Sequence, residues 1–503
     1  MGYLEEKSFS KTLIIGGIIV SILHSIFFWR QAEGISAPIF AIIFLIYLIC
    51  CIKQKKIKAN HGAYMLAVPI LLLSATYFIY NNATFRFLNF WAIIGLVVIM
   101  SILLITKETN HLFVKILRSI FKPIEYIGEV FKNIGNIIHK KEEKKPKTQK
   151  AKIIKAIFIS LPIAIIVIFL LMAADETFAE FFQQIIQKII DIFNIQRISE
   201  LVVRAFLAFI IFLYFTSFIL NMLSNKTAEI IEKENQKPSS IHIEETTIQV
   251  LLTILNGIYL LFSLVQLVNI FTEMGVPREL GNYAIIARQG FFQLMLVTLI
   301  NLAAIYFSCK NTKSTNSTYT KAMSQIMLLF NIFFIFIAAY KMFLYEQEFG
   351  YTYSRLLVYF ILATELLFII PCSFYIYNKK VPIFKIGLGI VTTMYVILNF
   401  ANIDAIIAKR NIDRYIETGK IDFAYLEDHV GTDAKEQMER LLTEKPKTQE
   451  YEEIDRKLER YFRRIDTKLK KERQSIFSFN LSKNRFHIDI DSLKEYNNDD
   501  LLI

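Results

Sequence analysis

Glu365 is an acidic residue near the middle of an apolar run that covers about residues 356–377. An ionised carboxylate is costly in hydrocarbon, so this group should be protonated, paired with a cation or exposed to a water-filled cavity. A carboxyl in such a place can bind and release a proton. A structural ion pair, or a neutral hydrogen-bonded acid that serves packing, explains the same residue equally well.

Neighbouring apolar runs carry polar groups that could lie beside this carboxyl. Its possible partners are Asn256, Lys341, Arg288 and Arg204. Amides inside a membrane usually bond neighbouring helices, and each contributes only about 0.6–2 kcal/mol, so a structural role for them is the simpler interpretation. The candidate intramembrane polar site consists of Glu365, Asn256, Asn301 and Lys341.

A second group of candidate residues lies in three short motifs. The motifs are YAIIARQGFFQL (residues 283–294), FGYTYSRL (349–356) and NIDAIIAKRNIDRY (402–415). Each follows an odd-numbered apolar run, so all three should lie on one face of a membrane. Some of their polar side chains could instead pair with local carboxylates. The candidate outer-face site consists of Arg288, Arg355, Asn411, Arg414 and Tyr415.

These residues must be positioned by helices that cross a membrane. The chain has 503 residues, of which 54% are hydrophobic and 44 are Phe, unlike an ordinary soluble domain. We predict an all-α polytopic transmembrane helix bundle of about 11 spans with a small, mainly helical C-terminal extramembrane segment. The expected spans are residues 12–29, 36–52, 64–80, 87–105, 157–173, 201–223, 247–271, 291–309, 325–345, 356–377 and 385–401.

Lysine clusters indicate which loops face the cytoplasm. KQKKIK (53–58), the segment 107–155 and NKKVPIFK (378–385) are rich in lysine, whereas NNATFR (81–86) carries one Arg. The positive-inside rule then places the N-terminus in the cytoplasm. An odd number of spans puts the C-terminal segment outside the cell (plasma) membrane, and one missed or additional span would reverse that side.

The polar segments divide the chain into four parts. These are N-terminal spans one to four (1–106), a basic cytoplasmic amphipathic segment (107–155), spans five to eleven (156–401) and the C-terminal extramembrane segment (402–503). In the basic segment, apolar residues recur at helical spacing around Pro123, which should bend the helix. This face could lie on anionic lipid or pack on the ends of the spans.

The C-terminal segment begins with strong helix signals. Asn402 and Asp404 are good N-caps for a helix that covers about residues 404–417, and Gly419 is a good C-terminal cap. Asp422 should cap a second short helix. These local roles explain all four residues without a functional site.

Further along, a helix should open near Thr432 and Asp433, and the charged stretch 452–471 has a narrow apolar stripe. Such a stripe needs a partner surface, and we expect the C-terminal segment as a whole to dock on the membrane part or on another protein. Alternating apolar residues in 477–481 and 486–490 predict a β-hairpin. The stripe consists of Ile454, Leu458, Tyr461, Ile465 and Leu469.

The motif at 402–415, with GKIDFAYL at 419–426 and Asp433-Ala434, resembles the bacterial membrane proteins classified as domain of unknown function 4173 and their 4153 relatives. The motifs at 283–294 and 349–356 support the resemblance, which covers about residues 251–442 and is most specific at 402–415. It implies a prokaryotic integral membrane protein with no settled biochemical activity. The resemblance therefore names a family without naming a function.

The sequence contains no P-loop, no HExxH, no paired CxxC, no GxSxG and no dinucleotide fingerprint. An enzyme is therefore unsupported, and the sequence indicates no catalytic residue, metal or cofactor. The net charge of +12 comes from short clusters between apolar runs, so we expect lipid rather than nucleic acid as the partner.

Two functions remain in view. The first is a non-catalytic membrane component that engages an envelope or signalling partner through the outer-face motifs and the C-terminal segment. The second is a transporter or lipid-handling protein that uses Glu365 and the amides near it. Replacing Glu365 by Gln should abolish the function of a proton-coupled transporter but affect a scaffold only through its stability.

Overall fold

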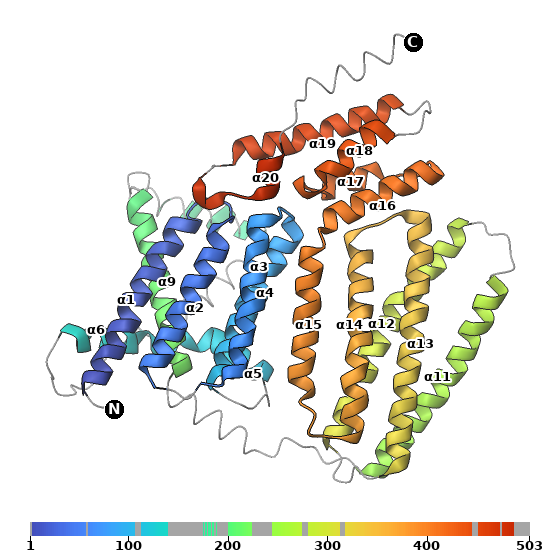
Figure 1. Cartoon of the computed structure of the whole chain (residues 1–503), viewed down its shortest axis with the longest axis horizontal. Helices are drawn as coiled ribbons and strands as arrows, with labels where there is room; N and C mark the ends of the chain where they lie inside the picture. Colours follow the sequence, from blue (N-terminus) through green and yellow to red (C-terminus); the bar gives the residue numbers. More distant parts are fainter. Residues whose placement is uncertain are drawn as a thin grey trace. The chain divides into compact units, whose positions relative to one another are not determined.

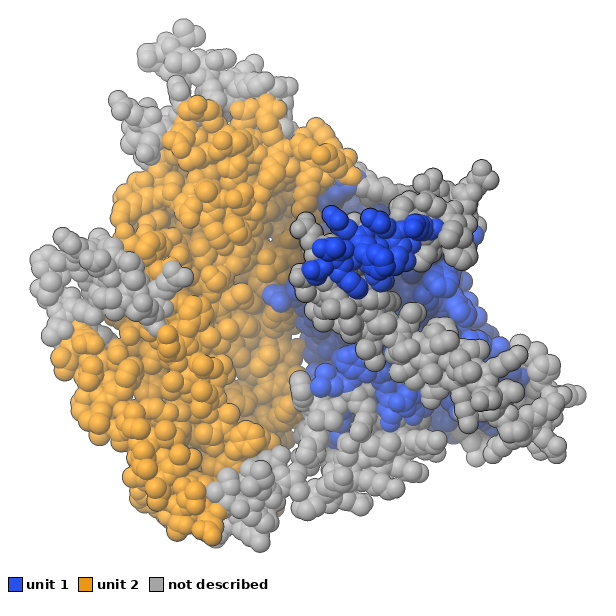
Figure 2. Space-filling model, turned by 180° about the vertical axis from the view of Figure 1, so that it is seen from behind, with its two compact units in different colours: residues 1–79, 87–237, 472–480 blue, residues 80–86, 238–471, 481–503 orange. Residues whose placement is uncertain are grey.

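The computed structural model of the chain is helical in the part that it describes, which contains no β-strand (Figure 1). The described residues are 3–56, 59–105, 112–138, 200–223, 244–273, 280–311, 317–444, 451–472 and 475–486, with a few residues between 175 and 188. Figure 2 distinguishes two compact units. Unit 1 comprises residues 1–79, 87–237 and 472–480, and unit 2 comprises residues 80–86, 238–471 and 481–503.

Unit 1 is built on helices that alternate in direction. Tyr47 donates to the Leu13 carbonyl at 2.7 Å, and Asn89 donates to Thr76 at 3.0 Å, so α1 and α3 run antiparallel to α2 and α4. Its helices are α1 (Tyr3–Phe28), α2 (Ser36–Gln54), η1 (His61–Leu66), α3 (Ala67–Ile79), α4 (Ala83–Ile105, first turn in unit 2), α5 (Leu112–Phe121), η2 (Lys122–Tyr126), α6 (Ile127–Ile138) and α9 (Glu200–Leu223).

The basic amphipathic segment forms α5, η2 and α6 in unit 1. The 3₁₀ turn η2 contains Pro123 and interrupts the helix, as predicted for a residue that has no amide hydrogen. Val130 of α6 is fully buried in a cluster with Ile14 of α1 and Phe212 of α9. Asn133 also accepts a 2.7 Å hydrogen bond from Ser10. The apolar face of α6 is therefore packed on spans.

The membrane part of unit 2 is a bundle of five helices organised around α13. This helix packs against α11, α12 and α14, and α14 packs against α15. Fully buried side chains on α13, including Met327, Phe334 and Met342, supply much of the core. The helices are α11 (Glu245–Glu273), α12 (Leu280–Asn311), α13 (Thr318–Phe349), α14 (Tyr353–Tyr377) and α15 (Ile383–Phe400).

Ten helices among the described residues are long and apolar enough to cross a membrane. They correspond to ten of the eleven predicted spans, and the remaining one, residues 157–173, lies outside the described part. The predicted polytopic helix bundle is confirmed. In lipid each backbone N–H and C=O needs a partner within its own segment, so long apolar runs become helices. The four cysteines are free thiols; Cys50 is exposed and the other three are buried.

The C-terminal segment forms a small helical layer in unit 2. Leu458, Tyr461 and Phe462 of α19 are fully buried against the other helices of this layer, so the apolar stripe finds its partner surface within the chain. The elements are α16 (Ile403–Thr418), α17 (Phe423–His429), η4 (Thr432–Ala434), α18 (Lys435–Glu444), α19 (Tyr451–Lys471), η5 (Ile476–Ser478) and α20 (Leu481–Arg485). The helix expected near Thr432 is confirmed.

The predicted β-hairpin is wrong in its described part. Residues 476–478 form η5 and residues 481–485 form α20, while residues 487–490 lie outside the described part. The Ser475 hydroxyl accepts from the Ser478 amide at 3.2 Å, and the Ser475 amide donates to the Ser478 hydroxyl at 3.0 Å. These local bonds satisfy backbone groups that a strand would have paired across a ladder.

Candidate functional site

Glu365 lies on α14 with 3% of its surface exposed. The Thr298 hydroxyl of α12 is 2.6 Å from its Oε2 and 2.8 Å from the Met295 carbonyl. Oε1 of Glu365 has no hydrogen-bond partner among the described residues. A hydroxyl carries a single proton, so Thr298 cannot donate to both oxygens at once. Both contacts are satisfied together when Glu365 is protonated and donates to Thr298.

Three more side chains extend this contact across the bundle. Asn331 of α13 donates to the Thr298 carbonyl at 3.3 Å and accepts from Asn301 of α12 at 2.7 Å. Tyr259 of α11 donates to Asn301 at 2.6 Å. We call these five residues, which come from four helices, the polar seam: Tyr259, Thr298, Asn301, Asn331 and Glu365.

The structure therefore joins two of the four predicted intramembrane residues, Glu365 and Asn301. Asn256 instead donates to the Met323 carbonyl at 2.9 Å and ties α11 to α13. Lys341 packs over Gly290, where a Cβ would lie 2.8 Å from its Nζ. Arg204, in unit 1, donates to the Ser25 hydroxyl at 2.9 Å. The Thr298 hydroxyl, rather than one of these amides or basic side chains, is thus the hydrogen-bond partner of the carboxyl in the described part.

Glu346 is a second acid that the sequence analysis missed. It is 2% exposed and accepts a 2.9 Å hydrogen bond from Tyr359, and its Oε1 has no partner in the described part. The sequence analysis ended the preceding span at residue 345, but α13 continues to Phe349. Glu346 therefore lies inside the last turns of a span. The sequence carried a signal for this longer span, because apolar residues continue at helical spacing beyond residue 345.

Two of the three outer-face motifs meet at the turn between α13 and α14. Asn411 Nδ2 donates to the Tyr351 carbonyl at 2.9 Å, and Asn411 Oδ1 accepts from the Tyr351 amide at 2.9 Å. Arg414 donates to the carbonyls of Gln347 at 3.1 Å and Glu348 at a shorter distance. These donors hold the turn against α16.

The remaining outer-face candidates serve the same turn or lie apart from it. Arg355 donates to the carbonyls of Phe349 and Gly350 and lies over the Tyr345 ring. Tyr415 is buried in the core of the C-terminal layer. Arg288 is in α12, and its side chain lies outside the described part. The described polar groups of this set are used largely on backbone carbonyls, which explains them without a ligand.

A third cluster, also missed, consists of two carboxyl groups that hold the segment 81–82. Asp404 is 1% exposed; its two oxygens accept from the Asn82 side chain and from the Gly431 amide at 2.9 Å. Asp433 is partly buried and accepts from the Asn81 amide at 2.8 and 3.0 Å. Asn402, rather than Asp404, caps α16 through the Ala405 amide, so the predicted capping role of Asp404 is replaced by these tertiary contacts.

Burial sets the protonation behaviour of this acid pair. Burial, together with the nearby charge of Asp433, raises the pKa of Asp404 to about 7, although the bonds from Gly431 and Asn82 oppose the shift. Burial also raises the pKa of Asp433, against the hydrogen bond from Ser482. Asp404 and Asp433 are two ligands at most, and no group of three or more His, Cys, Asp or Glu residues in the described part could hold a metal ion.

One comparison with known proteins gives a match. Residues 67–441, about three quarters of the 503-residue chain, match the family described as "Domain of unknown function (DUF4153)". No curated protein and no solved structure matches the chain. The matched range runs from α3 to α18, so it contains the polar seam, the α13–α14 turn and the acid pair.

Proposed function

Because the chain belongs to the DUF4153 family, whose description assigns no activity, we propose a function from the chemistry of unit 2: a transporter that binds a proton at Glu365 and releases it across the membrane. The protein is a multi-pass integral membrane protein, and the five-helix bundle of unit 2 is the part that we assign to transport.

The contact between Thr298 and Glu365 carries this proposal. The hydroxyl is within hydrogen-bond distance of both the carboxyl and the Met295 carbonyl, an arrangement that favours a protonated Glu365. The other carboxyl oxygen lacks a partner among the described residues, so deprotonation would leave a poorly compensated charge in a span. Such a group can keep its proton in this conformation and lose it when water or a cation reaches it.

Glu346 and Tyr359 supply a second proton-binding position beside α14. Tyr359 precedes Glu365 by six residues, which is about 9 Å along the helix axis. Its hydroxyl donates to Glu346, near the end of α13. A proton released at the polar seam would therefore have an acceptor closer to the α13–α14 turn. We assign Glu346 the role of an intermediate carrier.

Proton flux into liposomes tests the proposal. Full-length protein is reconstituted, a potassium gradient with valinomycin drives protons inward, and an internal dye reports pH. Glu365→Gln should abolish the protein-dependent flux, and Glu365→Asp should retain part of it. Glu417→Gln, at an exposed position on α16, is the matched control and should leave the flux unchanged. Equal flux in wild type and in correctly folded Glu365→Gln would contradict the proposal.

Engagement of an envelope or signalling partner is the second candidate, and the exposed face of α19 favours it. That face presents basic side chains to solvent, among them Arg456, Arg463, Lys468 and Lys471, whereas the opposite face is buried. A photo-crosslinker at Lys468 should give a discrete adduct in cells, while one at Glu417 should not. Adducts of the same pattern from both positions would argue against a partner on α19. On this view the outer-face motif residues orient the layer that carries α19.

We propose that the N-terminus is cytoplasmic and that the C-terminal segment is extracytoplasmic in the plasma membrane. α9 is antiparallel to α1, because Arg204 bonds Ser25 near the end of α1, so α9 runs in the same direction as α4. The predicted eleven-span topology likewise gives α4 and α9, its fourth and sixth spans, the same direction. A cysteine at Ser475, in a background without the native four, should react with an impermeant maleimide in intact cells; protection until lysis would reverse the topology.

Anionic lipid at the basic segment 107–155 is part of the same proposal. α6 buries Val130 on the spans but leaves Phe131 exposed, a residue that can enter the interface beside Lys132. Labelling Phe131→Cys with an environment-sensitive dye should give a blue shift in vesicles that contain phosphatidylglycerol. An unchanged spectrum relative to the soluble dye would place this face in water.

A further inference from the structure

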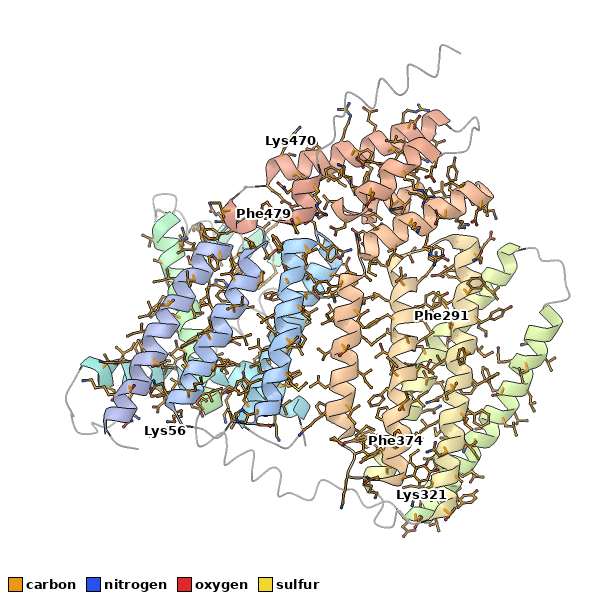
Figure 3. The ribbon with its side chains drawn as sticks, in the orientation of Figure 1. Lys56, Phe291, Lys321, Phe374, Lys470 and Phe479 are labelled. Carbon is orange, nitrogen blue, oxygen red and sulfur yellow. The ribbon has the colours of Figure 1, made fainter. Side chains whose placement is uncertain are left out.

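A groove between α14 and α15 has a volume of about 980 Å³, at the upper end of the range for small-molecule sites. Its walls are almost entirely apolar, and both helices are candidate membrane spans. Phe374, labelled in Figure 3, is one of the wall residues. The lining residues are Leu367, Ile370, Pro371, Phe374, Tyr377, Asn378, Val381, Pro382, Ile386, Gly389, Ile390, Thr393, Met394 and Ile397.

Of two glycines on α15, Gly387 packs against α14 and Gly389 lines the groove. A Cβ at Gly387 would lie 2.5 Å from the Phe368 ring, so this face of α15 is in close contact with α14. Gly389 faces the groove, and a Cβ there would meet no described atom within 4 Å. A larger residue at 389 would fill space that the present sequence leaves empty.

The groove has the length and the chemistry for acyl chains. From Pro382, the N-cap of α15, to Ile397 it extends over 15 residue steps, about 22 Å, which exceeds half of a hydrocarbon core about 30 Å thick. Among its wall residues, Ile370 and Ile397 are 57% exposed and Phe374 is 64% exposed. Water cannot cover such surfaces favourably, and lipid tails can.

One end of the groove is strongly basic. The turn at residues 378–382 closes it, and Lys379, Lys380 and Lys385 are exposed there. The chain contains no acidic residue from position 366 to position 403, so this stretch has a net positive charge. Asn378 holds the turn by accepting from the Lys380 amide at 3.0 Å. The charge is complementary to the phosphate of a lipid headgroup.

From the apolar walls and the basic end together, we infer that the α14–α15 groove binds one anionic phospholipid, with its acyl chains along α15 and its phosphate at Lys379, Lys380 and Lys385. The lipid is a bound component at this position, distinct from the surrounding bilayer. The inference does not depend on proton transport, because it uses no residue of the polar seam. It gives unit 2 a lipid-specific site on the outside of its bundle.

Native mass spectrometry of the full-length protein, released from detergent with phosphatidylglycerol or phosphatidylcholine added, tests the inference. Wild type should retain one phosphatidylglycerol in preference to phosphatidylcholine. The triple variant Lys379→Gln, Lys380→Gln, Lys385→Gln should lose that preference by roughly tenfold or more. The matched control replaces Lys53, Lys55 and Lys56, a lysine cluster at the end of another span, and should keep it.

Gly389→Phe distinguishes lipid binding in the groove from a general attraction of lipid by charge. It should remove the retained lipid of both types, whereas Gly389→Ala, whose methyl group fits the open space, should not. Equal thermal stability of the two variants excludes misfolding as the cause. Three outcomes would overturn the inference: retention unchanged in Gly389→Phe, an equal loss in the lysine control, or a dimer without lipid that dissociates in Gly389→Phe.

Discussion

The side chain of Asn411 brackets a single residue, Tyr351, by accepting from its amide and donating to its carbonyl, each at 2.9 Å. Tyr351 lies between α13 and α14, where backbone groups have no helical partner. Asn411 therefore provides the hydrogen-bond donor and acceptor that a neighbouring strand or helix would provide elsewhere. The contact anchors α16 to the bundle of unit 2.

Asn411→Ala should lower the free energy of unfolding by about 1–3 kcal/mol, because it leaves the Tyr351 amide and carbonyl unpaired in a partly buried place. Unfolding in detergent, followed by hydrogen exchange in residues 403–418, measures the change. Lys409→Ala on the exposed side of the same helix should stay within about 0.5 kcal/mol of wild type. Similar losses in both variants would show that the bracket contributes little.

Gly350→Ala should destabilise the protein more than Gly419→Ala. Gly419 (φ 72°, ψ 2°) is left-handed helical, where an Ala costs about 1–2 kcal/mol, whereas Gly350 (φ 77°, ψ −171°) lies in a region that is essentially confined to glycine. A Cβ at Gly350 would also collide with Asn411, whereas a Cβ at Gly419 meets nothing within 4 Å in the described part. The larger drop in melting temperature expected for Gly350→Ala combines this backbone strain with the collision. An equal drop in both variants would contradict the prediction.

The C-terminal layer should lose stability as pH rises from about 4 to about 7. The pKa of Asp404 is raised to about 7 in the folded protein from an ordinary value of 3.8, so the folded state binds the proton more tightly than the unfolded state between these values. The contribution of Asp404 to stability is then greatest below pH 4, and it no longer changes above pH 7. Asp433, whose pKa is also raised, adds to the same slope.

Hydrogen exchange of residues 403–441 at several pH values checks this dependence. Asp404→Asn should weaken the contact with Gly431, because an amide nitrogen can replace an accepting oxygen, but it should flatten the slope. Asp428→Asn, for a carboxyl at the exposed end of α17, should keep the slope. A slope as steep in Asp404→Asn as in wild type would assign the titration to another group.

Asn301 and Asn331 should show a direct coupling energy of about 0.6–1.7 kcal/mol in a double-mutant cycle with Ala. Their side chains share a 2.7 Å hydrogen bond in the core of the bundle. Asn256, which bonds the Met323 carbonyl instead, should be additive with Asn301 within about 0.5 kcal/mol. Unfolding in mixed detergent micelles measures both cycles, and coupling in the second cycle alone would contradict the polar seam.

The spans and most helix ends could be predicted because their causes are local. About 20 consecutive apolar residues suffice to cross hydrocarbon, and the described helices follow those runs. Asn402, Gly419 and Asp422 cap helices as their residue types suggest, since each satisfies backbone groups within four residues of itself. The predicted hairpin was wrong because alternation of apolar residues is a weak signal for strands. Local hydrogen bonds between Ser475 and Ser478 stabilise a 3₁₀ turn there instead.

Apolar runs and their polar flanks predicted a membrane helix bundle with a polar C-terminal layer, and they placed Glu365 inside a span. The partners of the acids became visible in the folded chain: Thr298 for Glu365, and Asn82, 322 residues away, for Asp404. Partner choice depends on how each helix is rotated about its axis and which turn packs beside it. Those quantities follow from the fit of many side chains together, so no spacing within one segment reveals them.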